Sequence, residues 1–385
     1  MIFDTVDYEV LKLAGVCRYF PFALKRRFNS ELLSSNTIDN LKLHNLIKSM
    51  NDHLSFKLTK KGRECLADIG YEFTQDARTD IKKASYFRKL ENAKWNVLLT
   101  IAGIDVYYSN ARTLADTEKG YISTLAMRTD KNMKVLAGSK FLGVLKDKET
   151  AYVPYYVKDR ESWIYPFFER TTYRSQIESM RSINEIKLIL TGETLEELWG
   201  NITTHGKPPS YRNGMMPFSL ALEELGSEFL LVPLSDNGVI QMRLLLTCRY
   251  RERLASAIGC KKNIIPNLSE CDGFKNDTPY IIAIDFNVKR IVRALRQIEK
   301  YDKNLVPRIC CLPFQKNCIM KLLKEYNSSK TIVTAIPKDK IYVVFPELKI
   351  NNIERKAYTK DGECIEIPGR KLTEDEEAIY SEDKA

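Results

Sequence analysis

The chain has 385 residues, of which 44% are hydrophobic and 29% are charged, a balance that is typical of a folded globular protein and excludes a disordered or fibrous one. The length exceeds one ordinary hydrophobic core, so we expect two or three domains. The net charge of +10, from 60 Lys and Arg against 50 Asp and Glu, favours an anionic partner and disfavours an acidic one.

The sequence contains no membrane or export signal that we can identify. No stretch reaches the roughly eighteen uncharged apolar residues that a membrane helix needs, and residues 1–4 lack the basic start of a secretory signal. We therefore expect a cytoplasmic protein without a membrane segment. The nine cysteines, including the adjacent Cys310 and Cys311, show no C-x-x-C motif and no zinc spacing, so we expect reduced and mostly buried thiols.

The first fifty residues predict three helices. Apolar spacing predicts a helix over 8–17, which ends before Pro21 because a proline disfavours helical geometry in the residue before it. A short helix over 22–28 carries a basic run. Ser34 and its two neighbours offer N-caps for a third helix, whose apolar positions recur with helical spacing as far as Met50.

A strand and a further helix follow these three helices. Residues 54–63 alternate as a strand does and break at Thr59-Lys60-Lys61-Gly62, before a helix over 64–69. A strand, an L-T-x-x-G motif and a helix are typical of the wing of winged-helix domains, with Thr59 capping the helix that follows. Residues 6–70 therefore resemble the winged-helix class.

In that class the third helix enters the major groove and the wing contacts backbone phosphates. The candidates for contacts with base edges share amide, hydroxyl or ammonium groups on the exposed face of the third helix, and they are Asn36, Thr37, Asn40, Lys42, Asn45 and Lys48. The candidates for phosphate contacts are the basic residues of the second helix and the wing, Lys25, Arg26, Arg27, Lys57, Lys60, Lys61 and Arg63. The alternative is a winged helix that docks a protein and has a solvated basic face.

The middle of the chain predicts a connector and the start of a larger domain. Residues 75–134 form the connector, with one or two helices that Gly103 ends; they bridge the domains or pair with their copy in a homodimer. After about residue 135 strands alternate with helices, which predicts an α/β domain around a mixed sheet. Its first elements are a hairpin over 141–157, a helix through 167–180, a strand over 186–190 and a helix over 194–199.

The second half continues this alternation. A loop over 205–214 precedes a second hairpin, with strands over 229–233 and 239–246 around Asn237-Gly238. In both halves of this domain a hairpin or strand is followed by a helix and a strand, so the two halves share a pattern of elements but no sequence repeat. The remaining elements are a basic helix with Arg249, Arg251 and Arg253, a strand over 280–286, a helix over 288–301, a strand over 307–312, a helix through Leu323, and strands over 332–336 and 341–345. Residues 351–385 form an extension whose acidic tail we expect to be disordered.

The layout resembles a known family. An N-terminal winged helix, a helix that runs into Ala102-Gly103-Ile104, and an α/β domain with hairpins and basic helices are similar to the replication-relaxation family of Gram-positive plasmids and integrative conjugative elements. The resemblance implies binding at an origin of replication or transfer, beside a relaxase or a replication initiator. It also implies a C-terminal domain related to restriction-endonuclease folds.

The residues argue against a nuclease of that fold. Such an enzyme needs an aspartate on one strand and a D/E-x-K pair on the next, so that two carboxylates hold magnesium. The first hairpin offers acidic residues only at its turn, Asp147 and Glu149. On the later strand Asp285 precedes Lys289, but Asn287 stands where a second carboxylate is needed.

Other catalytic motifs are missing from the sequence. The three histidines, His44, His53 and His205, are far apart and form no histidine-cluster metal site. The sequence has no phosphate-binding loop, no G-x-G-x-x-G and no G-x-S-x-G. Twenty tyrosines leave a tyrosine nucleophile formally open, but no basic triad marks one of them.

We therefore expect an α+β or α/β protein with a winged helix-turn-helix over 1–74, a helical connector over 75–134, an α/β domain over 135–350 that is restriction-endonuclease-like in the resemblance, and an extension over 351–385. The expected function is sequence-specific binding of double-stranded DNA by an accessory or regulatory protein of a mobile element, without catalysis, cofactor or metal. The alternatives are a metal-dependent endonuclease or relaxase with an unrecognised site, and a protein-docking scaffold.

Overall fold

The protein is described by a computed structural model that covers residues 3–51, 53–71, 73, 84–108, 111–127, 136, 138–159, 162–180, 183–203, 215–225, 228–349, 355–358 and 364–367. The chain forms two compact units: unit 1 is Met1–Val97 with Ile350–Ala385, and unit 2 is Leu98–Lys349. Unit 2 ends at Lys349, one residue before the domain boundary that the sequence predicts at 350. The other expected boundaries, after 74 and 134, lie outside the described residues, as do the expected loop over 205–214 and the acidic tail.

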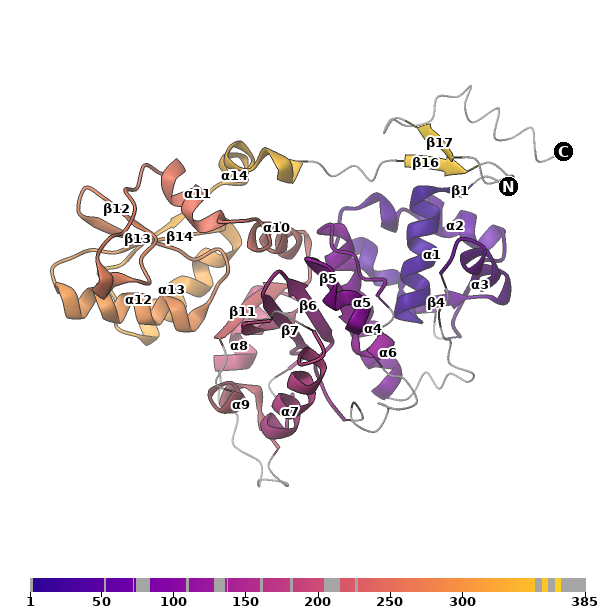
Figure 1. Cartoon of the computed structure of the whole chain (residues 1–385), viewed down its shortest axis with the longest axis horizontal. Coiled ribbons are helices and arrows are strands. Elements are labelled where there is room, and N and C mark those ends of the chain that lie inside the picture. The colour runs from indigo at the N-terminus through magenta and orange to yellow at the C-terminus, as the bar shows by residue number, and fades with distance from the viewer. Residues whose placement is uncertain are drawn as a thin grey trace. The chain divides into compact units, whose positions relative to one another are not determined.

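The architecture mixes helices and sheets, as the sequence predicts. Fourteen α-helices and five sheets are present among the described residues (Figure 1). None of the described helices is both long enough and apolar enough to cross a membrane.

Unit 1 begins with a small set of helices around a three-stranded antiparallel sheet in the order β2-β4-β3. Buried side chains such as Leu11, Leu41, Phe56 and Leu66 form its interior. The elements are α1 (Thr5–Cys17), β2 (Phe20–Pro21), the 3-10 turns η1 (Phe22–Arg26) and η2 (Glu31–Leu33), α2 (Ser35–Leu43), β3 (Ile47–Ser49), β4 (Ser55–Leu58) and α3 (Lys60–Ala67).

Helix α2 is shorter than the apolar spacing predicts. Ser34 caps its start as expected, because its side chain accepts from the backbone N–H of Thr37 at 3.2 Å. Asn45 then adopts φ 57°, and the N–H of Leu46 donates to the carbonyl of Leu41 at 2.9 Å. This left-handed cap ends the helix. The expectation of a helix reaching Met50 was wrong, since the chain turns into strand β3.

Two of the three lysines expected on the wing, Lys60 and Lys61, belong to a helix, and Lys57 lies on strand β4. Thr59 accepts from the N–H of Gly62 at 3.0 Å and caps α3, which confirms the predicted cap. Because the helix starts at Lys60, the expected strand over 54–63 was too long. The hairpin that follows α2 is β3–β4 instead, over residues 47–58.

Two distant segments complete unit 1. Helix α4 (Ala84–Ile101) packs its first half on the N-terminal elements, where the Tyr86 hydroxyl lies 2.7 Å from the Ser55 hydroxyl. It ends at Gly103 with φ 84°, as predicted. Strand β16 (Arg355–Tyr358) pairs with β1 (Phe3–Asp4) on one side and with β17 (Cys364–Ile367) on the other, so segments near both ends of the chain share one sheet.

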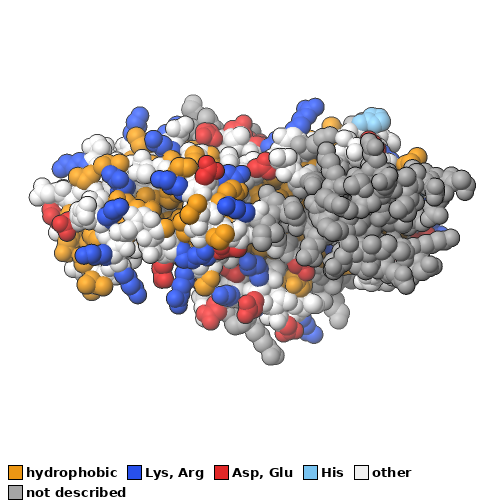
Figure 2. All heavy atoms as spheres, turned by 90° about the horizontal axis from the view of Figure 1, so that it is seen from above, with side chains coloured by type: hydrophobic (Ala, Val, Ile, Leu, Met, Phe, Trp, Pro, Cys, Tyr) orange, Lys and Arg blue, Asp and Glu red, His pale blue; other side chains and the backbone are white. Residues whose placement is uncertain are grey.

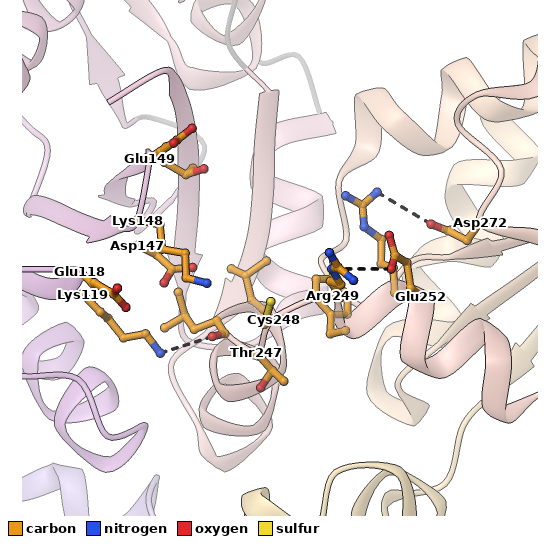
Figure 3. A pocket seen from close by; sticks show the side chains of 15 residues that line it. Glu118, Lys119, Asp147, Lys148, Glu149, Thr247, Cys248, Arg249, Glu252 and Asp272 are labelled. Carbon is orange, nitrogen blue, oxygen red and sulfur yellow. Dashed lines mark hydrogen bonds and ion pairs between the residues drawn. The ribbon is translucent and has the colours of Figure 1, made fainter. Parts of the chain in front are cut away.

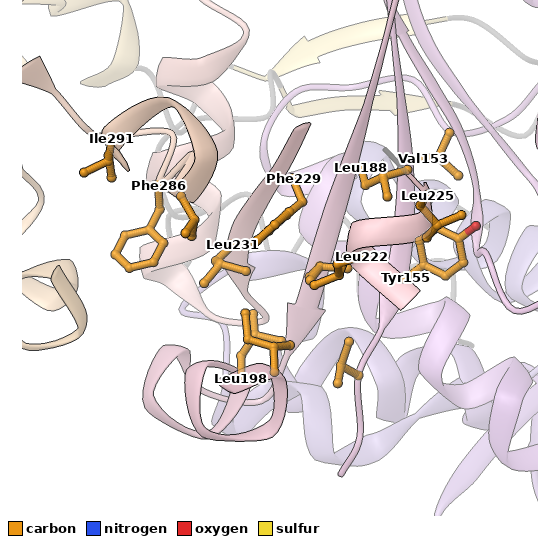
Figure 4. Close-up of a cluster of buried hydrophobic side chains, with 14 of the residues drawn as sticks. Val153, Tyr155, Leu188, Leu198, Leu222, Leu225, Phe229, Leu231, Phe286 and Ile291 are labelled. Carbon is orange, nitrogen blue, oxygen red and sulfur yellow. The ribbon is translucent and has the colours of Figure 1, made fainter. Parts of the chain in front are cut away.

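Unit 2 contains a five-stranded sheet, called sheet one, in the order β11-β9-β7-β6-β5. Strands β5 to β7 are antiparallel, and β7, β9 and β11 are parallel. The strands are β5 (Lys119–Ser123), β6 (Gly143–Asp147), β7 (Thr150–Tyr156), β9 (Glu185–Gly192) and β11 (Glu228–Pro233). Helices α7 (Pro166–Ile177), α8 (Leu195–Thr203) and α9 (Phe218–Leu225) cover one face through the apolar cluster of Figure 4.

A second sheet in unit 2, called sheet two, has the order β12-β13-β14-β15. It repeats the layout of an antiparallel hairpin followed by two parallel strands. The strands are β12 (Gly273–Lys275), β13 (Thr278–Ile282), β14 (Arg308–Cys311) and β15 (Ile332–Ala335). Helices α12 (Val288–Tyr301) and α13 (Lys316–Glu325) pack on one face, while α11 (Tyr250–Ala257) and α14 (Lys338–Val344) pack on the other.

The continuous apolar runs of sheet two follow from burial on both faces. Cys311 lies in the core with α12 and α13, whereas its neighbour Cys310 lies in the core with α11 and α14. Adjacent cysteines therefore point to opposite faces, and burial raises the pKa of each thiol to about 12. The described cysteines are free thiols, as expected.

Two expected strands are helices. Residues 239–246 were expected to form the second strand of a hairpin, but they lie mostly in α10 (Asp236–Leu245). A Cβ on Gly238 would lie 1.8 Å from the Pro233 carbonyl oxygen. The glycine therefore allows α10 to approach the end of β11 closely and does not form a tight turn. A hairpin turn with positive φ occurs later in the chain, at Asn276 and Asp277 between β12 and β13. Residues 341–345, expected as a strand, belong mostly to α14.

We expect Gly238→Ala to lower the thermal unfolding temperature of the protein, because overpacking against the Pro233 carbonyl costs about 1–3 kcal/mol. Gly200→Ala is the matched control, since its added methyl group meets no atom within 4 Å in helix α8. That change should stabilise the protein by about 0.5–1 kcal/mol. Equal melting temperatures for the two variants would contradict the close approach of α10 to β11.

Candidate functional site

The hairpin β3–β4 places two lysines side by side. Lys48 and Lys57 are direct cross-strand partners, with Lys48 exposed and Lys57 half-buried. Directly opposite side chains in an antiparallel pair share one face, and like charges in this position destabilise the pair. A phosphate beside both ammonium groups would relieve their repulsion. The sequence placed Lys48 on the third helix as a base-contact candidate and Lys57 on the wing. Lys48 lies on strand β3 instead, because α2 ends at Leu43, and the register brings the two lysines together.

The outer face of α2 offers fewer base-reading groups than expected. Asn36 is exposed, as a contact with a base edge requires. The Asn40 amide donates to the Asp7 carboxylate at 3.0 Å and so ties α2 to α1. The Thr37 hydroxyl lies 2.8 Å from that of Ser34, within the helix cap.

Two other expected base readers also have local roles. The Lys42 ammonium lies 4.7 Å from the centroid of the Phe22 ring, in a cation–π arrangement. Asn45 is exposed, and its left-handed backbone ends α2. Asp39 and Leu43, which were not among the candidates, are also exposed on α2, Leu43 at 70%. Their spacing from Asn36, at i+3 and i+7, is the signal that could have shown them.

The phosphate candidates form two further groups. Arg26 is the exposed last residue of η1, and Arg27 follows it and is half-buried. Lys25 also lies within η1, but its side chain is not among those that the structure describes. The others occupy the first turn of α3: Lys60, which pairs with Glu64 at 3.5 Å, Lys61, which is exposed, and Arg63, which is half-buried. Cations at a helix start add to its positive end, so this turn favours an anion.

Unit 2 contains a cavity of about 680 Å³ between the β5–β6–β7 sheet edge and the start of α11 (Figure 3). Its walls carry four basic and five acidic side chains. Arg251 lies 3.9 Å from Asp272, and Lys119 donates to the Leu246 carbonyl at 3.3 Å. Burial raises the pKa of Asp147 on the opposite wall. Because acids and bases are nearly balanced, the cavity has no strong preference for an anion or a cation.

Asp285 and Asn287, from the segment that most resembles a nuclease motif in the sequence, have structural roles at the start of α12. Asp285 is 5% exposed, accepts from the Asn287 N–H at 3.2 Å and lies 3.8 Å from the Arg290 guanidinium. Asn287 caps α12 and donates to Glu228 at 2.7 Å. Burial lowers the pKa of Lys289. Asp285 and Asn287 are therefore held in structural contacts at the start of α12.

Arg290 is the centre of a buried charge network. It donates to Asp272 at 3.2 Å, to the Glu270 carbonyl at 3.0 Å and to the Ile282 carbonyl. Burial alone would lower the pKa of Arg290, but Asp272 and Asp285 outweigh burial and raise it. The pKa of Asp272 is raised by burial, although the nearby positive charges of Arg290 and Arg251 act to lower it.

No metal centre is found in the part of the chain that the structure describes, since no group of three or more His, Cys, Asp or Glu residues could hold an ion there. The chain was compared with protein-family models, curated proteins and solved structures, and none of them matches it.

We expect Arg290→Met to destabilise unit 2 by about 3–5 kcal/mol, because it removes the cation that Asp285 and Asp272 share in the interior. Thermal unfolding followed by circular dichroism measures this loss. Arg296→Met on the exposed side of the same helix is the control and should change stability little. Similar losses for the two variants would show that the network does not hold the fold.

Proposed function

We propose that residues 5–67 form a winged helix-turn-helix that binds double-stranded DNA. Support comes from the order of elements: helix α1, strand β2, the turns η1 and η2, helix α2, then the hairpin β3–β4. In a winged helix the recognition helix precedes a hairpin, the wing, that meets the DNA backbone. Helix α2 takes the first role in this proposal and hairpin β3–β4 the second.

The observation that carries the proposal is the pairing of Lys48 with Lys57 on that hairpin. Two ammonium groups directly opposite each other concentrate positive charge on one face of the hairpin. Phosphate groups of DNA lie along a backbone at regular spacing and would neutralise both cations. Arg26 and the first turn of α3 provide further basic groups within the same small set of elements.

The biological setting in this proposal rests on the sequence resemblance to the replication-relaxation family. It places the protein at an origin of replication or transfer of a plasmid or conjugative element, as an accessory or regulatory factor. A relaxase or a replication initiator is the protein partner that this setting implies, and a homodimer would suit a symmetric DNA site.

The endonuclease alternative applies to sheet one. Its mixed arrangement, three antiparallel strands continued by parallel ones, is compatible with a restriction-endonuclease-like fold. Strand β7 carries no acidic residue, however, and Asp285 is ion-paired with Arg290. We therefore propose a binding role without cleavage. Magnesium-dependent nicking of supercoiled DNA that disappears in Asp285→Asn would favour the alternative.

Lys48→Glu should affect stability and DNA binding in opposite directions. A Glu–Lys pair across β3–β4 replaces repulsion by attraction and should stabilise unit 1 by about 0.2–1 kcal/mol. Duplex affinity should fall, and the slope of log K against log salt should flatten by about 0.9 for each phosphate that is no longer neutralised. Thermal melting and fluorescence anisotropy measure the two effects. Lys158→Glu, at an exposed site in unit 2, is the control. Unchanged duplex binding would show that the hairpin does not face DNA.

Contacts with bases and with phosphates should separate in a second comparison. Asn36→Ala should cost roughly 1–3 kcal/mol on the cognate duplex and little on random DNA, because an amide reads one base edge. Lys60→Ala with Lys61→Ala should weaken binding to all duplexes alike. Selection of a binding site from random DNA supplies the cognate duplex. Weak, salt-independent binding by the unaltered protein would favour the protein-docking scaffold.

A further inference from the structure

The positive charge of the chain is concentrated in one part of unit 2. Residues 246–349, which follow α10 and complete unit 2, contain 20 Lys and Arg and 10 Asp and Glu. The rest of the chain contains 40 of each, so this segment carries the whole net charge of +10. In Figure 2 blue side chains outnumber red ones over the part of unit 2 that sheet two and its helices form.

Helices α12 and α13 carry much of this excess on one surface. Both pack on the same face of sheet two, so their outer sides point away from it together (Figure 1). Outside the core they present seven Lys and Arg but only Glu299 and Glu325 as acids. We call this surface the α12–α13 face; its exposed basic residues are Arg293, Arg296, Lys300, Lys316, Lys321 and Lys324.

Most of these cations form no ion pair within the described residues. Arg293 pairs with Glu228 and Glu270. The other five exposed basic groups of the face lie more than 4.0 Å from every carboxylate that the structure describes. Arg296 and Lys300 are four residues apart on one helix, a spacing at which like charges repel. A polyanion on this face would remove that repulsion.

Two exposed tyrosines adjoin the cations. Tyr301 is the last residue of α12 and is 51% exposed, and Tyr326 follows the last turn of α13 and is 44% exposed. Helix α12 leads from β13 to the parallel strand β14, and α13 leads from β14 to the parallel strand β15. Both helices therefore end on the same side of sheet two, beside the starts of β14 and β15. Basic groups interleaved with exposed aromatic rings suit a strand whose phosphates pair with lysines and whose bases stack on tyrosine.

We infer that the α12–α13 face binds single-stranded nucleic acid, with Tyr301 and Tyr326 as stacking platforms. Unpaired bases are the form that favours an exposed ring, because the bases of a duplex already stack on one another. This site is separate from hairpin β3–β4, and the inference holds whether or not unit 1 binds duplex DNA.

The experiment measures binding of the full chain to labelled oligo(dT) and to a random duplex over a range of salt. Replacing Lys316, Lys321 and Lys324 together by Ala should flatten the salt slope for oligo(dT) by about 2, at about 0.7 for each phosphate that is no longer neutralised. The control replaces Lys261, Lys262 and Lys340, exposed lysines of the same segment outside α12 and α13. It removes the same charge and should flatten the slope by less than half as much.

The tyrosines give the second readout. Tyr301→Leu with Tyr326→Leu keeps apolar bulk and should weaken oligo(dT) binding at least about fivefold, with the duplex unaffected. Lys48→Glu in unit 1 should leave oligo(dT) binding unchanged, which separates this site from the duplex site. The inference is overturned if the two lysine triples act equally, or if the tyrosine variant, folded by circular dichroism, binds oligo(dT) as the unaltered chain does.

Discussion

A single buried guanidinium holds sheet two together. Arg290 joins the start of α12 to the loop before β12 through Asp272 and Glu270, and to the end of β13 through the Ile282 carbonyl. An isolated charge at 4% exposure would be costly, so the fold depends on two carboxylates remaining beside it. With its inner side fixed in this way, α12 can leave Arg296 and Lys300 on its outer side for other partners.

Helices and strands with one consistent period were predictable from the sequence. The helix over 288–301 was predicted close to its observed bounds, because burial on one side imposes a clear periodicity. The hairpin over 141–157 was predicted because a polar turn separates two apolar runs, which are buried on both faces. The strands expected at 239–246 and 341–345 are helices because short apolar runs fit both periods. Gly238 was interpreted as a turn residue, since the sequence does not reveal its approach to Pro233.

The candidate site was predictable in composition but not in arrangement. Basic and amide groups gather in residues 25–63 as the sequence indicates, yet Asn40 bonds to Asp7 from a helix far away in the chain, which no local pattern shows. The pairing of Lys48 with Lys57 depends on register, and register follows from Asn45 ending α2 early. The α12–α13 face has one signal in the sequence, the uneven distribution of charge along the chain.

This distribution of charge suggests that affinity and sequence discrimination would come from different proposed surfaces. Residues 1–74 contain 11 Lys and Arg against 9 Asp and Glu, a small excess for a module that binds DNA. Affinity for a single strand follows the number of phosphates neutralised, so it should come mainly from residues 246–349, with their excess of ten. Unit 1 would then contribute discrimination between duplexes through few contacts, because hydrogen bonds to base edges need correct placement rather than net charge. The two proposals together assign duplex DNA to unit 1 and a single strand to unit 2, and both forms of DNA occur at an origin where strands have begun to separate.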